Sequence, residues 1–211
     1  MKLSAKEIHS THSQALAGME SVRYEISQEG FRQFKAAVDG GMETEVHGVL
    51  AKHPEILRDV MPDVGHHGMW FSNKPQIRPP LTNGKKGKIP DLLLAGKGSG
   101  GFAWFLVELK SPLTTLFNGS GNAFSKSANE GLNQLASYLH YAIEKQGAIR
   151  DALEIPDFTT PRGILIIGRE SETFDDEVKG ELKAFWNQIL STIQIVSYDR
   201  VLKLAEKLLK H

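Results

Sequence analysis

Asp91, Glu108 and Lys110 have the residue types and the spacing of a metal-dependent hydrolytic site. Asp91 lies near the start of one apolar run, IPDLLLA, and the other two residues end a second run, FAWFLVELK. Residues two apart on a strand project to the same face, so Glu108 and Lys110 share a face. If the intervening turn is centred between Ser99 and Gly100, Asp91 lies opposite Glu108, with Cβ atoms ~4.5–5.5 Å apart. A slip of one residue would separate the two carboxylates across the sheet.

Two carboxylates this close repel each other, and one takes up a proton unless a cation lies between them. Ligation by oxygen alone favours Mg²⁺ or Mn²⁺ over zinc. Such an ion activates water and stabilises charge on a phosphate, while Lys110 would hold the water or neutralise the phosphate. The pattern therefore predicts phosphodiester hydrolysis. The simpler interpretation is a turn-capping aspartate and an exposed Glu-x-Lys ion pair, but the apolar run before Glu108 favours a buried carboxylate that needs a partner.

Composition and charge narrow the class of protein. The 211 residues include no cysteine, which excludes disulfide scaffolds, iron–sulfur clusters and thiol nucleophiles. The net charge is 25 − 25 = 0, yet residues 71–129 hold eight basic and two acidic side chains, a net charge of +6. This basic region is expected to attract a polyanion. No apolar run approaches the ~18 residues of a transmembrane helix and the start lacks a signal-peptide pattern, so we expect a cytoplasmic protein without a membrane partner.

The order of apolar patterns predicts an α/β fold, with a central mixed β-sheet flanked by helices. Strand patterns occur at 69–71, 89–95, 102–110, 163–168 and 192–198, and the second and third of these form a hairpin. Helical patterns occur at 1–39, from 43 onward, at 127–146, at 175–190 and after Asp199, which we expect to cap the last helix. Gly40-Gly41 interrupts the pattern. We therefore predict an N-terminal helical segment at 1–40 and a main domain at 41–211.

Several of these motifs resemble a known group of enzymes. IPD at 89–91, the hairpin and ELK at 108–110 resemble the signature of the PD-(D/E)XK nucleases. The next helix carries Gln134 and Tyr138 in QLASY, which is similar to the QxxxY motif of the RecB-like branch.

A narrower resemblance comes from the segments on either side of this signature. ETEVHGVLAKHPEIL contains Glu45 nine residues before Pro54 and resembles the helical glutamate segment of the Shedu proteins. The C-terminal strands and helices are similar to those of the same family. The resemblance covers roughly residues 43–209.

The resemblance implies a PD-(D/E)XK restriction-endonuclease-like core and a Mg²⁺- or Mn²⁺-dependent DNA endonuclease of bacterial anti-phage defence. The metal ligands that it implies are Asp91, Glu108, the Leu109 carbonyl and, through water, Glu45. By the same resemblance Lys110 is the catalytic lysine, and Gln134 orients it or a scissile phosphate.

The expected partners are double-stranded DNA and further copies of the chain. The DNA-binding residues we predict are Lys85, Lys86, Lys88 and Lys126, the first three in a loop that leads into Asp91. Cutting both strands needs two sites, so we expect a dimer or tetramer. Two alternatives stay open at this point: a catalytically weak or inactive nuclease-like module that binds DNA or DNA ends, and an RNA nuclease, because nothing in the sequence distinguishes a 2′-hydroxyl.

Overall fold

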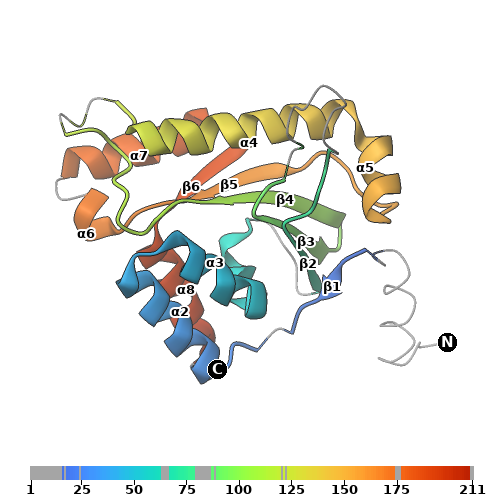
Figure 1. The fold of residues 1–211 in the computed structure, drawn as a ribbon, viewed down its shortest axis with the longest axis horizontal. Coiled ribbons are helices and arrows are strands. Elements are labelled where there is room, and N and C mark those ends of the chain that lie inside the picture. The colour runs from blue at the N-terminus through green and yellow to red at the C-terminus, as the bar shows by residue number, and fades with distance from the viewer. Residues whose placement is uncertain are drawn as a thin grey trace.

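A six-stranded mixed sheet forms the centre of the molecule, with helices on both faces (Figure 1). The computed structural model describes residues 16, 18–23, 25–62, 67–78, 87, 89–119, 121, 123–173 and 177–209. The strands lie side by side in chain order: β1 (Glu20–Ser21), β2 (Met69–Asn73), β3 (Leu92–Gly98), β4 (Gly101–Leu109), β5 (Arg162–Ile166) and β6 (Ile193–Val196). The predicted α/β fold with a central mixed sheet is confirmed.

The hairpin of β3 and β4 has the register that the sequence predicts. Gly98 pairs with Gly101 and Leu92 pairs with Val107, so the turn is centred between Ser99 and Gly100. Gly101 has a φ of 107°, a conformation that favours glycine and allows the tight turn. Because side chains alternate along a strand, this register decides which residues of β4 share a face with which residues of β3.

The other half of the sheet is parallel. β4 pairs with β5, and β5 pairs with β6, in the same direction. Parallel neighbours need crossover connections, which are α4 (Lys126–Glu144) with α5 (Gln146–Leu153), and then α6 (Glu170–Thr173) with α7 (Glu177–Ile189). Parallel strands are covered on both faces, which explains why GILI in β5 is buried throughout.

Two apolar cores lie on the two faces of the sheet. One core lies between the sheet and the helices below it in Figure 1, which are α2 (Gln28–Gly40), α3 (Glu43–Lys52), the 3-10 helix η1 (Pro54–Val60) and α8 (Tyr198–Leu209). The other core lies between the sheet and the helices α4 and α7 above it. Leu92 and Leu94 face the first core, while Leu93 and Ala95 face the second.

The N-terminal part of the chain departs from the prediction of a helical segment. Residues 20–21 form the edge strand β1, which pairs with β2, so pairing with the sheet overrides a loose helical pattern. α2 begins only after Ser27, whose Oγ accepts a hydrogen bond from the N–H of Gly30 at 3.0 Å. Residues 1–15 lie outside the described residues.

α2 packs in the same core as the helices that follow it. Phe34 and Val38 of α2 are buried with residues of α3 and α8. The predicted boundary between 1–40 and 41–211 stays a prediction.

The last helix begins two residues earlier than predicted, at Tyr198 rather than after Asp199, and its cap is a different residue. Ser197 Oγ accepts from the N–H of Arg200 at 3.2 Å, so Ser197, and not Asp199, caps α8. Asp199 instead accepts a hydrogen bond from Arg169 at 2.9 Å. The expectation was wrong because a long-range ion partner occupies the carboxylate.

Among the described residues, no helix is both long and apolar enough to cross a membrane.

The close approach of α4 to the sheet makes a prediction about two glycines. A Cβ on Gly131 of α4 would lie 2.7 Å from Leu165 Cδ1 and 3.2 Å from Lys110 Cε, whereas a Cβ on Gly180 of α7 would meet nothing within 4 Å. Gly180→Ala should raise the free energy of unfolding by up to about 1 kcal/mol through helix propensity. Gly131→Ala should lower it by about 1 kcal/mol or more through overpacking. Urea unfolding measures both, and equal stabilisation by the two variants would contradict this packing.

Candidate active site

Asp91 and Glu108 lie opposite each other at the open end of the hairpin. The last paired residues of β3 and β4 at this end are Leu92 and Val107, and one further step in the same register places Asp91 opposite Glu108. The pair that closes a two-residue turn is hydrogen-bonded, and pairs alternate from there, so the Asp91–Glu108 position is of the non-hydrogen-bonded type. In such pairs the side chains approach most closely. The register therefore brings the two carboxylates to one face.

Pro90 ends the ladder between β3 and β4. The next step in the register places Pro90 opposite Leu109, and proline has no N–H to donate to the Leu109 carbonyl. The N–H of Leu109 donates instead to Asp91 Oδ2 at 2.8 Å. The N–H of Lys110 donates to the Ile166 carbonyl of β5 at 2.9 Å. The Leu109 carbonyl points away from that N–H in the same trans peptide, and so lies on the Asp91 side.

Lys110 joins the carboxylate pair to α4. Its Nζ donates to Glu108 Oε1 at 2.9 Å and to Gln134 Oε1 at 2.8 Å. The Glu108 side chain is only 6% exposed and the Lys110 side chain 15%. The structure thus brings together four of the predicted site residues, Asp91, Glu108, Lys110 and Gln134.

Burial and a second carboxylate disfavour the charged form of Glu108. Desolvation raises its pKa most, the negative charge of Asp91 raises it further, and the hydrogen bond from Lys110 lowers it, leaving a pKa of about 7. The ammonium of Lys110 alone therefore does not stabilise the carboxylate fully. An added cation between the two carboxylates would do so.

Glu43, which sequence reasoning missed, lies nearer to this site than Glu45. Burial raises the pKa of Glu43, the charge of Asp91 raises it further, and Lys110 lowers it. Glu45 Oε2 lies 3.3 Å from where a Cβ on Gly40 would be, so it faces the turn between α2 and α3. Residues two apart on a helix do not share a face.

The helical phase could have identified Glu43. Val46 and Leu50, three and seven residues after Glu43, are the buried residues of α3. Glu43 therefore lies on the inward stripe and Glu45 off it.

Tyr138 links α4 to the segment before Asp91. Its hydroxyl donates to the Ile89 carbonyl at 3.3 Å. Burial, with smaller contributions from Glu108 and Asp91, raises the pKa of Tyr138 to about 12, so the phenol keeps its proton. Tyr138 therefore supports the position of the Ile89–Asp91 segment.

Of the four predicted DNA-binding lysines, the structure describes one. Lys85, Lys86 and Lys88 lie outside the described residues. Lys126, the first residue of α4, has a side chain that is 90% exposed and lies 4.0 Å from Glu130. Its role stays a prediction.

The donor set fits a hard divalent cation held partly by water. Among the described residues, no group of three or more histidine, cysteine, aspartate or glutamate side chains is arranged to hold a metal ion. Mg²⁺, however, is usually held by one or two carboxylates, with waters and substrate oxygens completing its shell. Asp91, Glu108 and the Leu109 carbonyl form such a set. In the described part of the chain, the second oxygen of each carboxylate accepts no hydrogen bond.

Comparison with known families identifies the chain. The family described as Shedu protein SduA, C-terminal, matches residues 41–202, well over half of the chain. The chain belongs to this Shedu family. Comparison with curated proteins finds no match. The matched span contains both strands of the hairpin, Gln134 on α4 and both carboxylates of the site.

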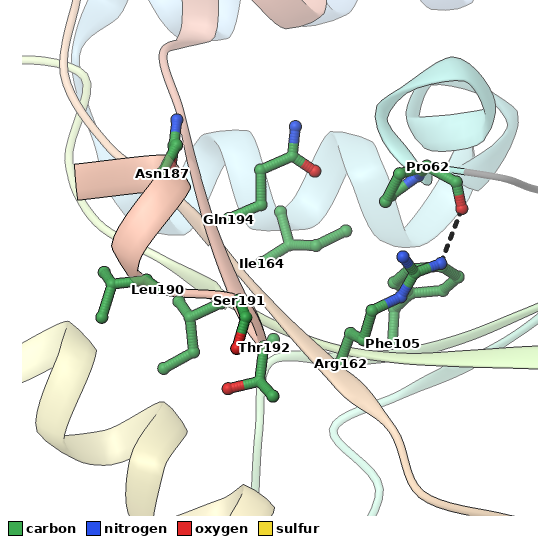
Figure 2. A pocket seen from close by; sticks show the side chains of 11 residues that line it. Pro62, Phe105, Arg162, Ile164, Asn187, Leu190, Ser191, Thr192 and Gln194 are labelled. Atoms are coloured by element: carbon green, nitrogen blue, oxygen red, sulfur yellow. Dashed lines mark hydrogen bonds between the residues drawn. The ribbon is translucent and has the colours of Figure 1, made fainter. Parts of the chain in front are cut away.

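A hollow lies at the end of the parallel strands opposite the candidate site, where β5 and β6 begin. It has a volume of about 240 Å³ and is lined by the first residues of β5 and β6 together with Pro62, Phe105 and the end of α7. Figure 2 shows Arg162 donating to the Pro62 carbonyl, at 2.8 Å, beside the Phe105 ring. Ligand sites in parallel sheets usually lie at the carboxyl ends of the strands, which is where Glu108 and Lys110 are. The hollow is therefore separate from the candidate active site.

The pKa of Glu108 predicts how stability depends on pH when divalent ions are chelated. The folded-state pKa of about 7 lies above the ordinary value of 4.5, so the folded protein binds the proton more tightly. This stabilisation is complete below about pH 4.5 and is lost as the pH rises through about 7, a difference on the order of 3 kcal/mol. Glu108→Gln, which does not titrate, should lose less stability than wild type over this range. Urea unfolding at several pH values tests this, and parallel curves for the two proteins would refute it.

Proposed function

We propose that the protein is a Mg²⁺- or Mn²⁺-dependent endonuclease with a PD-(D/E)XK-type core, acting on double-stranded DNA. The observation that carries the proposal is the pairing of Asp91 with Glu108 across the end of the hairpin, with Lys110 hydrogen-bonded to Glu108. The buried carboxylate of Glu108, with the half-buried carboxylate of Asp91 beside it, is costly to a fold unless a cation offsets the charge. Membership of the Shedu family suggests that the activity serves anti-phage defence.

The residues at the site divide the work between them. Asp91, Glu108 and the Leu109 carbonyl would hold the ion, and we assign to Glu43 the water-mediated role that the family resemblance gives to Glu45. A bound divalent ion supplies a Lewis acid that makes water a better nucleophile and offsets phosphate charge. Lys110 has three ammonium protons, of which two are donated to Glu108 and Gln134. The third can be donated to the attacking water or to a phosphate oxygen, and Gln134 keeps the ammonium aimed there.

The substrate is inferred from charge. Residues 71–129, which include Asp91, Glu108 and Lys110, carry a net charge of +6. A polyanion such as DNA would neutralise this charge. We propose that Lys85, Lys86, Lys88 and Lys126 contact the phosphate backbone, and that the chain acts as a homo-oligomer, since cutting both strands needs two sites.

Replacing the lysine should separate cleavage from binding. Lys110→Ala should reduce cleavage of plasmid DNA in Mg²⁺ or Mn²⁺ by at least about 10²-fold, because it removes the donor aimed at the developing charge. The affinity for the same DNA should fall little, because one buried ammonium contributes little to a multi-phosphate contact. Gel-based cleavage and fluorescence anisotropy measure the two quantities.

The same assay decides between the proposal and its alternatives. Lys207→Ala, which removes an exposed lysine of α8 outside the proposed site and the proposed DNA contacts, is the matched control and should retain cleavage. DNA binding without cleavage, unchanged by Glu108→Ala, would favour a binding module. Faster cleavage of a matched RNA duplex than of the DNA duplex would favour an RNA nuclease.

Metal binding can be measured without DNA. Mn²⁺ should raise the melting temperature of the wild type, because a ligand that binds only the folded state stabilises it. Asp91→Asn and Glu108→Gln should abolish most of this rise, and Glu43→Gln should reduce it. Glu45→Gln is the matched control in the same helix and should leave the rise unchanged. A loss with Glu45→Gln but not with Glu43→Gln would overturn the assignment of Glu43.

A further inference from the structure

Tyr198 lies at the first position of α8, directly behind the candidate active site. Its side chain is fully buried, and its ring packs on Phe34 of α2 with ring centres 6.4 Å apart. Its own N–H donates to the Gly168 carbonyl at 3.0 Å, which ties the start of α8 to the end of the β5 segment. The ring is thus fixed by its contact with Phe34, and the backbone of Tyr198 is fixed by its hydrogen bond to Gly168.

The hydroxyl of Tyr198 donates to the carbonyl of Lys110 at 2.8 Å. The N–H of Lys110 donates to the Ile166 carbonyl at 2.9 Å. Both backbone polar groups of the lysine are therefore held by the C-terminal part of the chain. Burial raises the pKa of the Tyr198 phenol well above its ordinary value, with nearby Glu43 and Asp91 adding to the effect, so the hydroxyl stays a donor.

The two peptides on either side of the Lys110 Cα are each held by a hydrogen bond. Tyr198 holds the carbonyl of the peptide between Lys110 and Ser111, and Ile166 holds the N–H of the preceding peptide. Because each peptide unit is planar, these two anchors restrict the Cα–Cβ direction of Lys110.

A hydroxyl is not needed to fill this space. Phenylalanine would pack on Phe34 equally well, and burying a hydroxyl is unfavourable unless it is hydrogen-bonded. The single hydrogen bond that the hydroxyl makes in the described structure is to the carbonyl of Lys110. The oxygen atom of Tyr198 therefore serves the lysine and not the core.

We propose that Tyr198 is a positioning residue for Lys110: its hydroxyl clamps the lysine backbone so that the ammonium is aimed between Glu108 and Gln134. The inference rests on the proposed nuclease function. Small misplacements of a catalytic group have large effects on rate, so the clamp acts on turnover and not on DNA binding.

Tyr198→Phe tests the clamp. At saturating DNA the variant should show a kcat about tenfold lower than wild type, while KM and the DNA affinity measured without metal stay within about twofold. Val201→Ala, which truncates a buried residue one turn further along α8, is the matched control for lost stability. Measured well below both melting temperatures, it should retain the wild-type kcat.

Hydrogen exchange gives a second measurement that does not depend on cleavage. The amide of Ser111, which belongs to the peptide whose carbonyl Tyr198 holds, should exchange faster in Tyr198→Phe but not in Val201→Ala, while amides of β2 and β3 stay protected in both and show that the sheet is folded. A wild-type kcat in Tyr198→Phe, or unchanged exchange of the Ser111 amide, would overturn the inference. If the wild type cleaves no nucleic acid, the proposed function fails, and the exchange at Ser111 still decides whether Tyr198 holds the lysine backbone.

Discussion

The end of the β3–β4 ladder at Pro90 is the constraint on which the candidate site depends. Pro90 has no N–H, so the position opposite Leu109 offers no backbone donor to the Leu109 carbonyl. On the same side of β4, the Leu109 N–H donates to the Asp91 carboxylate at 2.8 Å. The end of the hairpin therefore presents two carboxylates, of Asp91 and Glu108, and the carbonyl of Leu109. In a continuous ladder the backbone groups there would pair with each other, and where the ladder stops they need other partners.

The buried charges persist because every element around them contributes one anchor. α4 approaches β4 closely at Gly131, which allows Gln134 to reach Lys110. β5 fixes the Lys110 N–H, and the start of α8 fixes its carbonyl through Tyr198. Burial and the charge of Asp91 raise the pKa of Glu108 to about 7 in spite of the hydrogen bond from Lys110, so the charged form of this carboxylate is disfavoured. A further positive charge beside it would therefore stabilise the ionised form.

The sequence predicted the parts of the site that follow from local periodicity. A two-residue turn and a period of two were enough to place Asp91 opposite Glu108, whereas the placing of Gln134 beside Lys110 came from the family resemblance. Prediction failed where contacts span the chain. Tyr198 is 88 residues from Lys110, and Asp199 was expected to cap a helix but pairs with Arg169 instead. In α3 the resemblance pointed to Glu45, whereas the helical phase places Glu43 on the inward face.

The family match covers the residues that build the candidate site. The matched residues 41–202 begin just before Glu43 and end just after Tyr198, which both lie near Lys110. α2 lies before this span, and its Phe34 packs on the Tyr198 ring. The register of one hairpin sets the carboxylate pair, whereas Lys110 is also held by α4, β5 and the start of α8. The complete site therefore needs the hairpin, the parallel half of the sheet and these helices to pack together.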